Sequence, residues 1–399
     1  MFIEILLAIF IGVSAGIFTG LTPGIHVNLV SILLFSSSPF LLQYASVLSL
    51  GCFIVAMAVT HTFLDSIPSI FLGAPDPAMA MGVLPGHRYL LEGRGILAVK
   101  LTLIGSLLGL LISVLFFPFF ALIIKLIYPL VKESIGYLLL FVICFSIFRN
   151  KRRLWAFLLI SLSGILGFIV LNLPGLQQPL FPLLSGLFGV STLLLSLAET
   201  SFIPKQHDDE ELTVKTKDIM IAIGAGETAG FLTSMLPGLG AAEAAAMATT
   251  LLKNLSRKAF MMLLGSINTV NFTLSLATLF ILSKARNGAV VVINQLMEPD
   301  LDAILVFLAV ALIAGCIATI IVLSLTKRIA KMLSKVDYKR LTIGIILLIT
   351  LLTIILSGWV GLLVLFTATC LGILPVKVYV SRTATMGCLI VPVMIFFLF

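Results

Sequence analysis

Long apolar runs, separated by short polar segments, follow one another along the whole chain. Runs such as 154–171, 301–325 and 341–356 approach the roughly 20 residues that a helix needs to cross the hydrocarbon core of a membrane. A transmembrane β-barrel would instead show alternating segments of about ten residues, and the sequence lacks that pattern. The runs therefore predict an all-α polytopic membrane protein, whose helices satisfy their backbone hydrogen bonds internally.

The runs predict about ten transmembrane helices and two broken re-entrant hairpins. The hairpins are expected at 5–38 and 219–252, where a run is interrupted by a Pro-Gly pair. The expected spans lie near 45–72, 96–117, 134–148, 154–171 and 180–198, and then near 259–283, 301–325, 341–356, 358–375 and 383–399. Short helices at 119–131 and 288–298 would change the count by about one or two.

Composition excludes a soluble domain, because 60% of the residues are hydrophobic and only 11% are charged, against about 25% in soluble proteins. The net charge is +8, and basic residues gather in short loops at 149–153, 253–258 and 327–340. Such loops are typical of the cytoplasmic side, which predicts a multi-pass plasma-membrane protein with its N-terminus outside. The five cysteines lie in apolar runs without metal-ligand spacing, so we expect neither a disulfide framework nor a transition-metal site.

Two segments of the chain resemble each other. Residues 15–24 read Ala-Gly-Ile-Phe-Thr-Gly-Leu-Thr-Pro-Gly and residues 229–238, which begin 214 positions later, read Ala-Gly-Phe-Leu-Thr-Ser-Met-Leu-Pro-Gly. We therefore expect two transmembrane repeats, 1–203 and 219–399, joined by a hydrophilic cytoplasmic linker at 204–218. An odd number of crossings in each half predicts that the second repeat is inverted, which is a recurrent design of secondary transporters.

Each Pro-Gly pair predicts a break between two half-helices, because proline removes a backbone N–H and glycine permits unusual turns. In a membrane such a break persists only where it faces protein or a water-filled cavity, and helix N-termini there attract an anion. We therefore predict that substrate binds between the two tips, with an ordinary kink or loop as the structural alternative. The predicted substrate-binding residues are Thr19, Thr22, Pro23, Gly24, His26, Asn28, Thr233, Pro237, Gly238, Gly240, Asn268, Asn271, Arg286 and Asn287.

Ionisable residues in apolar segments are costly and therefore indicate functional positions. His61 and Asp65 are four residues apart and share one helical face. They could pair for coupling to Na⁺ or protons, or form a structural hydrogen bond between helices. Asp76 and Glu243 are the other candidates for ion coupling.

Two further groups suit an anionic substrate. Asn268 and Asn271 could bind Na⁺ or substrate oxygens, or else form interhelical hydrogen bonds. Arg286 lies in a basic stretch, 284–288, on the side that is expected to face outward. Its guanidinium could bind a carboxylate bidentately, although a misplaced span would explain the unexpected charge equally well.

The same motifs resemble those of a known family. Gly20-Leu21-Thr22-Pro23-Gly24-Ile25 is similar to the first signature of the TctA family, the large membrane subunit of tripartite tricarboxylate transporters. Met235-Leu236-Pro237-Gly238-Leu239-Gly240 is similar to the second signature. The stretch 73–95, with its Pro-Gly turn and its Gly-Arg pair, resembles the region after the first hairpin of the family. The resemblance covers 16–110 and 225–295.

The chain departs from the family pattern in two respects. Ile25-His26-Val27-Asn28 stands where the family has a glycine pair, and the chain is shorter than typical bacterial members. It therefore resembles a divergent archaeal branch. The resemblance implies ion-coupled uptake of carboxylates, with a small membrane subunit and a soluble binding protein as partners. A homodimer is a further expectation, and nucleic acid is not an expected partner.

The leading hypothesis is a secondary active transporter for a small organic anion, driven by Na⁺ or H⁺, with no cofactor besides the coupling ion. The alternative is a translocase for polyprenyl phosphate or another lipid phosphate. An enzyme is disfavoured, because the sequence has no HExxH, GxSxG or P-loop motif. ATP-driven transport is disfavoured because the short linker carries no nucleotide motif.

Overall fold

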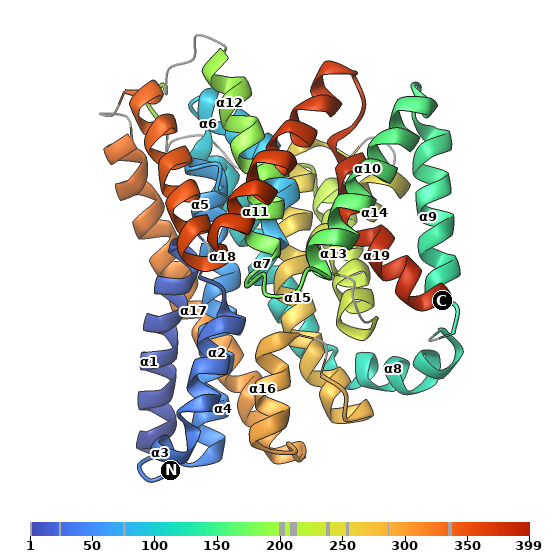
Figure 1. Ribbon diagram of the computed structural model, residues 1–399. Coiled ribbons are helices and arrows are strands. Elements are labelled where there is room, and N and C mark those ends of the chain that lie inside the picture. Colours follow the sequence, from blue (N-terminus) through green and yellow to red (C-terminus); the bar gives the residue numbers. More distant parts are fainter. Residues whose placement is uncertain are drawn as a thin grey trace.

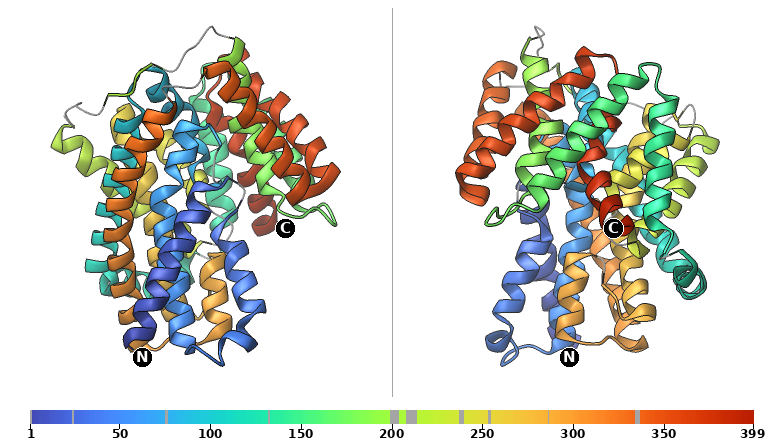
Figure 2. Two further views of the ribbon diagram at one scale, coloured as in Figure 1. Left: turned by 90° about the vertical axis from the view of Figure 1, so that its left-hand side faces the viewer. Right: turned by 45° about the vertical axis from the view of Figure 1, so that its right-hand side comes forward.

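The computed structural model describes residues 2–23, 25–74, 77–131, 133–198, 204–207, 214–236, 240–252, 255–285, 287–333 and 337–399. Every regular element in these ranges is a helix (Figure 1 and Figure 2). The first half contains α1 (Phe2–Leu21), α2 (Val27–Ser36), α3 (Ser38–Leu41), α4 (Val47–Leu64), α5 (Ser66–Phe71), the 3₁₀ helix η1 (Pro77–Gly82), α6 (Val83–Leu91), α7 (Gly95–Leu115), α8 (Phe117–Val131), α9 (Ile135–Arg149), α10 (Arg153–Leu171), α11 (Leu180–Leu184), the π-helix η2 (Ser185–Val190) and α12 (Ser191–Ala198). The second half contains α13 (Thr216–Met235), α14 (Ala241–Leu251), α15 (Arg257–Leu282), α16 (Gly288–Leu296), α17 (Leu301–Leu333), α18 (Tyr338–Lys377), the 3₁₀ helix η3 (Arg382–Met386) and α19 (Gly387–Leu398).

Seven helices in the described ranges are long and apolar enough to cross a membrane, and the bent pair α8 and α9 would make an eighth. Ten spans were expected from the sequence. The difference arises because the apolar stretches Leu180–Leu195 and Arg382–Leu398 are shorter, and because the expected spans 341–356 and 358–375 are the two arms of α18, which counts as one helix although its backbone is non-helical between them. α18 is kinked at Gly358, where φ is 65°, so the boundary between those two runs is visible in the backbone.

Two pairs of helices are interrupted at corresponding places. α1 and α13 begin at residues 2 and 216, and α2 and α14 begin at residues 27 and 241, a separation of 214 residues in both cases. His26 caps α2 by accepting a hydrogen bond from the backbone N–H of Asn28. Gly240 precedes α14 with an extended backbone. The helices therefore end and restart on either side of the Pro-Gly pairs, of which Gly24, Pro237 and Gly238 lie outside the described residues.

The centre of the molecule is formed by α4 and α15, which are the most deeply buried of the candidate spans. α1 packs along α4, and both α13 and α7 pack along α15. The backbones of α7 and α15 touch through glycines: a Cβ on Gly105 would lie 1.9 Å from the carbonyl oxygen of Met262, and a Cβ on Gly265 would lie 2.0 Å from that of Thr102. α4 and α15 run in opposite directions along the molecule (Figure 1).

Two connections at opposite ends of the molecule differ in charge. The N-terminus and the connection between α16 and α17 lie at the lower end in Figure 1, and this connection carries Glu298 and Asp300. The connection between α9 and α10 lies at the upper end and carries Arg149, Lys151 and Arg152. We refer to this upper end as the basic end. The N-terminus therefore lies opposite to the basic end.

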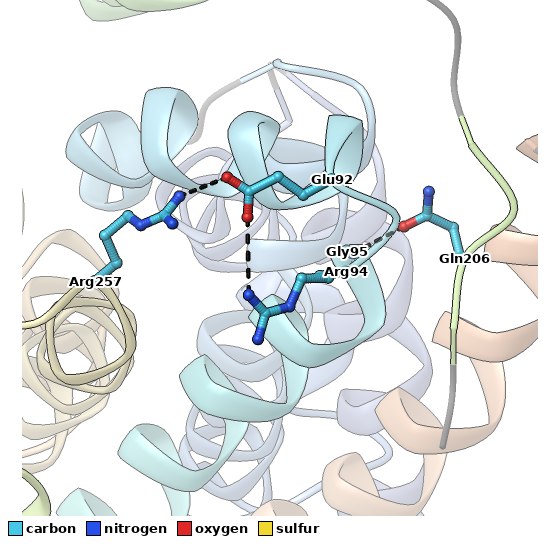
Figure 3. A network of polar contacts seen from close by, with 5 residues as sticks. All are labelled: Glu92, Arg94, Gly95, Gln206 and Arg257. Carbon is cyan, nitrogen blue, oxygen red and sulfur yellow. Dashed lines mark hydrogen bonds and ion pairs between the residues drawn. The ribbon is translucent and has the colours of Figure 1, made fainter. Parts of the chain in front are cut away.

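The described part of the hydrophilic linker is attached at the basic end (Figure 3). The side chain of Gln206 accepts a hydrogen bond from the backbone N–H of Gly95 at 2.8 Å and donates one to the carbonyl oxygen of Leu90 at 3.0 Å. Next to it, Glu92 accepts a hydrogen bond from Arg257 at 2.7 Å. The turn between α6 and α7 therefore holds both the linker and the start of α15.

Candidate functional site

A cavity of about 410 Å³ lies between the two broken helix pairs and the central helices α4 and α15. Its volume falls in the range of about 300–1,000 Å³ that is usual for small-molecule sites. The described residues that line it are neutral apart from two histidines. The polar ones are His26, Asn28, His61, Thr62, Thr233, Asn268, Asn271 and Asn287, and apolar residues from α10, α11 and α19 close the remaining wall.

Three helices begin at this cavity. His26, Gly240 and Asn287 directly precede α2, α14 and α16, and all three line the cavity. The side chain of Asn287 accepts a hydrogen bond from the backbone N–H of Ala289 at 3.0 Å, which fixes the start of α16. Helix N-termini carry partial positive charge and free N–H groups. The three helix starts therefore direct partial positive charge into the cavity, and no lysine or arginine is among its described lining residues.

The starts of α2 and α16 lie against each other. A Cβ on Gly288 would lie 2.6 Å from Cγ of Asn28, so the Asn28 side chain packs directly against the start of α16. The contact brings the Asn28 amide beside the N-terminus of a helix that is about 260 residues away in the sequence. It therefore joins the first broken pair to the second half of the chain at the cavity wall.

His61 connects three helices at the edge of the cavity. It is buried in α4, and its Nδ1 lies 3.1 Å from the hydroxyl oxygen of Thr19 in α1. Its ring also contacts the ring of His26 edge to face, with the centroids 5.0 Å apart. Thr19 therefore holds the His61 ring from behind and does not itself line the cavity.

Directly behind the cavity, polar side chains join α4 to α15. The amide Nδ2 of Asn268 donates a hydrogen bond to Oδ2 of Asp65 at 2.6 Å, and the hydroxyl of Thr269 donates one to the hydroxyl of Thr62 at 3.2 Å. Asp65 is 1% exposed, so its carboxylate is held by protein groups. Asn268 lines the cavity as well, and it therefore links the cavity wall to this buried acid.

The predicted site residues divide into three groups. The cavity is lined by His26, Asn28, His61, Thr233, Gly240, Asn268, Asn271 and Asn287. Thr19 and Asp65 contact this group from behind, whereas Thr22 and Pro23 do not line the cavity. Gly24, Asp76, Pro237, Gly238 and Arg286 lie outside the described residues, as does the side chain of Glu243.

The structure adds lining residues that sequence reasoning did not select. Thr62 and Phe272 each directly follow a residue that was predicted to belong to the site, so the prediction of the neighbouring residue already indicated their positions. Leu171, Leu389 and Val393 close the apolar wall from α10 and α19. Nothing in their local sequence distinguishes these three from the many other apolar residues of the chain.

The fold and this cavity define a class: an all-helical, multi-pass membrane protein whose interrupted helices begin at one internal polar cavity, as in membrane transporters. Comparison with known proteins agrees. The family model of the tripartite tricarboxylate transporter TctA family matches residues 6–387. The chain belongs to this family, and the resemblance found in its Pro-Gly motifs is confirmed.

The family is one of transporters of the tricarboxylate type, in which TctA is the large subunit. The chain is also 32% identical to an uncharacterized protein of Methanocaldococcus jannaschii, over 98% of this chain and 99% of that protein. This relative is consistent with the archaeal branch that the sequence suggested. No solved structure matches the chain.

Proposed function

We propose that this protein is a secondary active transporter that binds a small organic anion of the carboxylate class in the central cavity. The observation that carries the proposal is the convergence of three helix N-termini, at His26, Gly240 and Asn287, on one cavity. N–H groups and partial positive charge at helix starts favour an anion. The amides and hydroxyls of the wall can donate hydrogen bonds to several carboxylate oxygens at once.

Coupling to Na⁺ or H⁺ is assigned to the polar contact behind the cavity. Asp65, Thr62 and Thr269 supply a carboxylate and two hydroxyl oxygens at one crossing of α4 and α15, and oxygen atoms are the ligands that hard cations prefer. Asn268 contacts both the cavity and Asp65. Ion binding at Asp65 would thus change the position of an amide that faces the substrate.

The two halves are proposed to be inverted repeats, 1–203 and 219–399, joined by the linker 204–218. The equal spacing of the helix starts in the two broken pairs supports this proposal. So does the opposite direction of α4 and α15. By the positive-inside rule the basic end faces the cytoplasm, which would place the N-terminus outside the plasma membrane. Because the family consists of tripartite transporters, we also propose that a small membrane subunit and a soluble binding protein are partners of this protein. A homodimer is proposed in addition.

The test is uptake of radiolabelled citrate and other di- and tricarboxylates into proteoliposomes, with imposed Na⁺ and pH gradients. We expect uptake that depends on one of the two gradients. Asn271→Ala, which removes a cavity amide, should raise KM by about tenfold, because a hydrogen bond to a charged group contributes about 1.5–3 kcal/mol. Thr319→Ala serves as the matched control, because its hydroxyl bonds only to the carbonyl of Gly315 within α17.

Two outcomes would contradict the proposal. One is the absence of carboxylate uptake and of any stabilisation by carboxylates in a thermal-shift measurement. The other is specific binding of an isoprenoid phosphate, competed by inorganic phosphate and not by citrate. The second outcome would favour the alternative function, a lipid-phosphate translocase.

A further inference from the structure

Two further spaces continue from the central cavity toward the basic end, along α14. The central cavity is lined by Ala241 of α14 and by Leu389 of α19. The next cavity along both helices is lined by Met247 and Ile390, among others. A surface groove of about 520 Å³ follows, which Thr250 shares with that second cavity. The three spaces therefore follow one another along α14. α19 borders the first two, and the groove lies between α14, the end of α9 and η3.

The middle space is too small for a substrate. Its volume is about 20 Å³, which is room for roughly one water molecule. A small-molecule ligand needs a space of about 300 Å³ or more. Ala246 and Met247 close this space from α14, and Gly387 and Ile390 close it from the other side. This conformation therefore has a barrier between the central cavity and the groove.

The groove has the chemistry of an anion entrance. Its described lining consists of two basic side chains, Arg149 and Lys151, together with an amide and six hydroxyl-bearing residues. None of these lining residues is acidic. A concave surface lined by one sign of charge raises the local concentration of the opposite ion. The groove therefore concentrates anions directly outside the barrier.

The helices on the two sides of the barrier differ in their packing: α14 contacts α13, α15 and η1 through small alanine side chains. α19 is fixed to α10, because a Cβ on Gly167 would lie 1.7 Å from the carbonyl oxygen of Cys388 and one on Gly387 would lie 2.6 Å from that of Ile160. α14 has only 11 residues and is flanked by extended backbone at Gly240 and Leu252. Movement of α14 away from α19 would therefore open the barrier with the least disruption of close packing.

We propose that the carboxylate passes between α14 and α19, through the Arg149 and Lys151 groove, and that displacement of α14 opens this path at the basic end. The proposal rests on the transport function proposed above. It assigns the route of the carboxylate and identifies α14 as the gate. Neither assignment follows from the existence of a central binding site alone. It also assigns the groove a function that is separate from substrate binding.

A cross-link across the gate tests the proposal. Thr250 and Thr383 come from opposite sides and both line the barrier cavity and the groove. In a background in which the exposed Cys144, Cys316 and Cys370 are replaced by serine, we would join Thr250→Cys to Thr383→Cys with a short, reducible bifunctional thiol reagent. Uptake should fall by at least tenfold and return after reduction.

The matched control cross-links two segments that, according to the proposal, do not move relative to each other. Arg152 donates a hydrogen bond to the carbonyl oxygen of Val378 at 3.2 Å, so Arg152→Cys and Val378→Cys can be linked by the same reagent at the same end of the molecule. Uptake should be unchanged in this control. Full uptake by the cross-linked Thr250 and Thr383 pair would overturn the path while leaving the transport function intact.

The charge of the groove is tested separately. Lys151→Gln should raise KM by about three- to tenfold at low ionic strength, and the difference should shrink at high salt because screening removes the attraction. Lys339→Gln is the control, because Lys339 is an exposed basic residue near the start of α18 and does not line the groove. Equal KM values for the two variants would contradict the role of the groove.

A further measurement does not depend on the substrate. Ala246 lines the barrier cavity and not the groove. If the barrier opens at this end, a membrane-impermeant thiol reagent should modify a cysteine introduced by Ala246→Cys from the basic end and not from the opposite end, as judged with inverted and right-side-out vesicles. If the wild-type protein takes up no carboxylate, the transport function fails and this labelling alone decides the path. Modification from the opposite end, or from neither, would overturn it.

Discussion

At the residue scale, the site depends on polar side chains that find their partners on distant helices. Asp65 and Asn268 are 203 residues apart and share a hydrogen bond of 2.6 Å, and His61 and Thr19 are 42 residues apart and approach to 3.1 Å. In a membrane interior a buried polar group is costly unless it is paired. These contacts therefore both position the cavity wall and stabilise the helix crossing that carries it.

Asn268→Ala should lower the free energy of unfolding by about 1–3 kcal/mol, because it leaves a buried carboxylate with one donor fewer. Thermal unfolding in detergent would measure the loss. Thr278→Val in the same helix is the control, because the Thr278 hydroxyl bonds only to the carbonyl of Leu274 one turn earlier and should change the stability little. In an Asp65→Ala background the cost of Asn268→Ala should nearly disappear. An equal cost in both backgrounds would show that Asp65 is not the relevant partner.

The sequence predicted many of these residues as members of the site, but it did not predict which residues they contact. Asn28, Asn268 and Asn287 stand out as amides within apolar runs, so their presence at a site could be predicted. The contact between Asn268 and Asp65 could not be, because it depends on how closely α4 and α15 approach. That distance is set by side-chain packing along both helices, which one sequence does not reveal.

At the element scale, helix boundaries follow closely from the apolar pattern. The run at 154–171 became α10, Arg153–Leu171, and the expected span 96–117 became α7, Gly95–Leu115. The break inside α18 also follows the pattern. The expected spans 341–356 and 358–375 meet at Gly358, where φ is 65° and ψ is −165°, a conformation outside the helical region that glycine adopts readily.

Gly358→Ala should destabilise the protein by roughly 1 kcal/mol or more, because φ at this position is 65° and an L-residue is strained there. Gly344→Ala in the same helix should be neutral or stabilising by up to about 1 kcal/mol, since alanine favours a helix. Neither new Cβ would meet another atom within 4 Å, so the comparison isolates backbone conformation. Melting temperatures of the two variants would measure the difference. Equal values would mean that Gly358 does not keep this bend in the folded protein.

At the scale of the whole molecule, the halves are packed into each other and do not form separate units. α7 of the first half lies against α15 of the second, and α10 lies against α19. The first pair touches backbone to backbone at Gly105 and Gly265, and the second at Gly167. The sequence repeat predicted two halves, but the depth of their mutual packing could not be predicted from apolar runs alone.

A chain divided within the linker should therefore reassemble. We expect fragments 1–209 and 210–399, when expressed together, to co-purify through a tag on either fragment and to retain uptake. The first fragment keeps Gln206, whose bonds to Gly95 and Leu90 lie within that fragment. Each fragment alone should accumulate poorly, because its glycine-lined surfaces lack their partners. Stable accumulation of a lone fragment, with a sharp thermal transition, would contradict mutual dependence.

The contact between α7 and α15 also sets a condition on how the protein is made. Residue 115 ends α7 and residue 257 begins α15, so ribosomes that add about 5–20 residues per second need on the order of ten seconds to supply the second helix after the first. During that interval the hydroxyl of Ser106 in α7, which donates a hydrogen bond to the carbonyl oxygen of Gly265 in α15 at 3.1 Å in the finished protein, lacks that partner. A pause in translation between these helices would therefore lengthen the time for which the nascent protein is exposed to quality-control proteases.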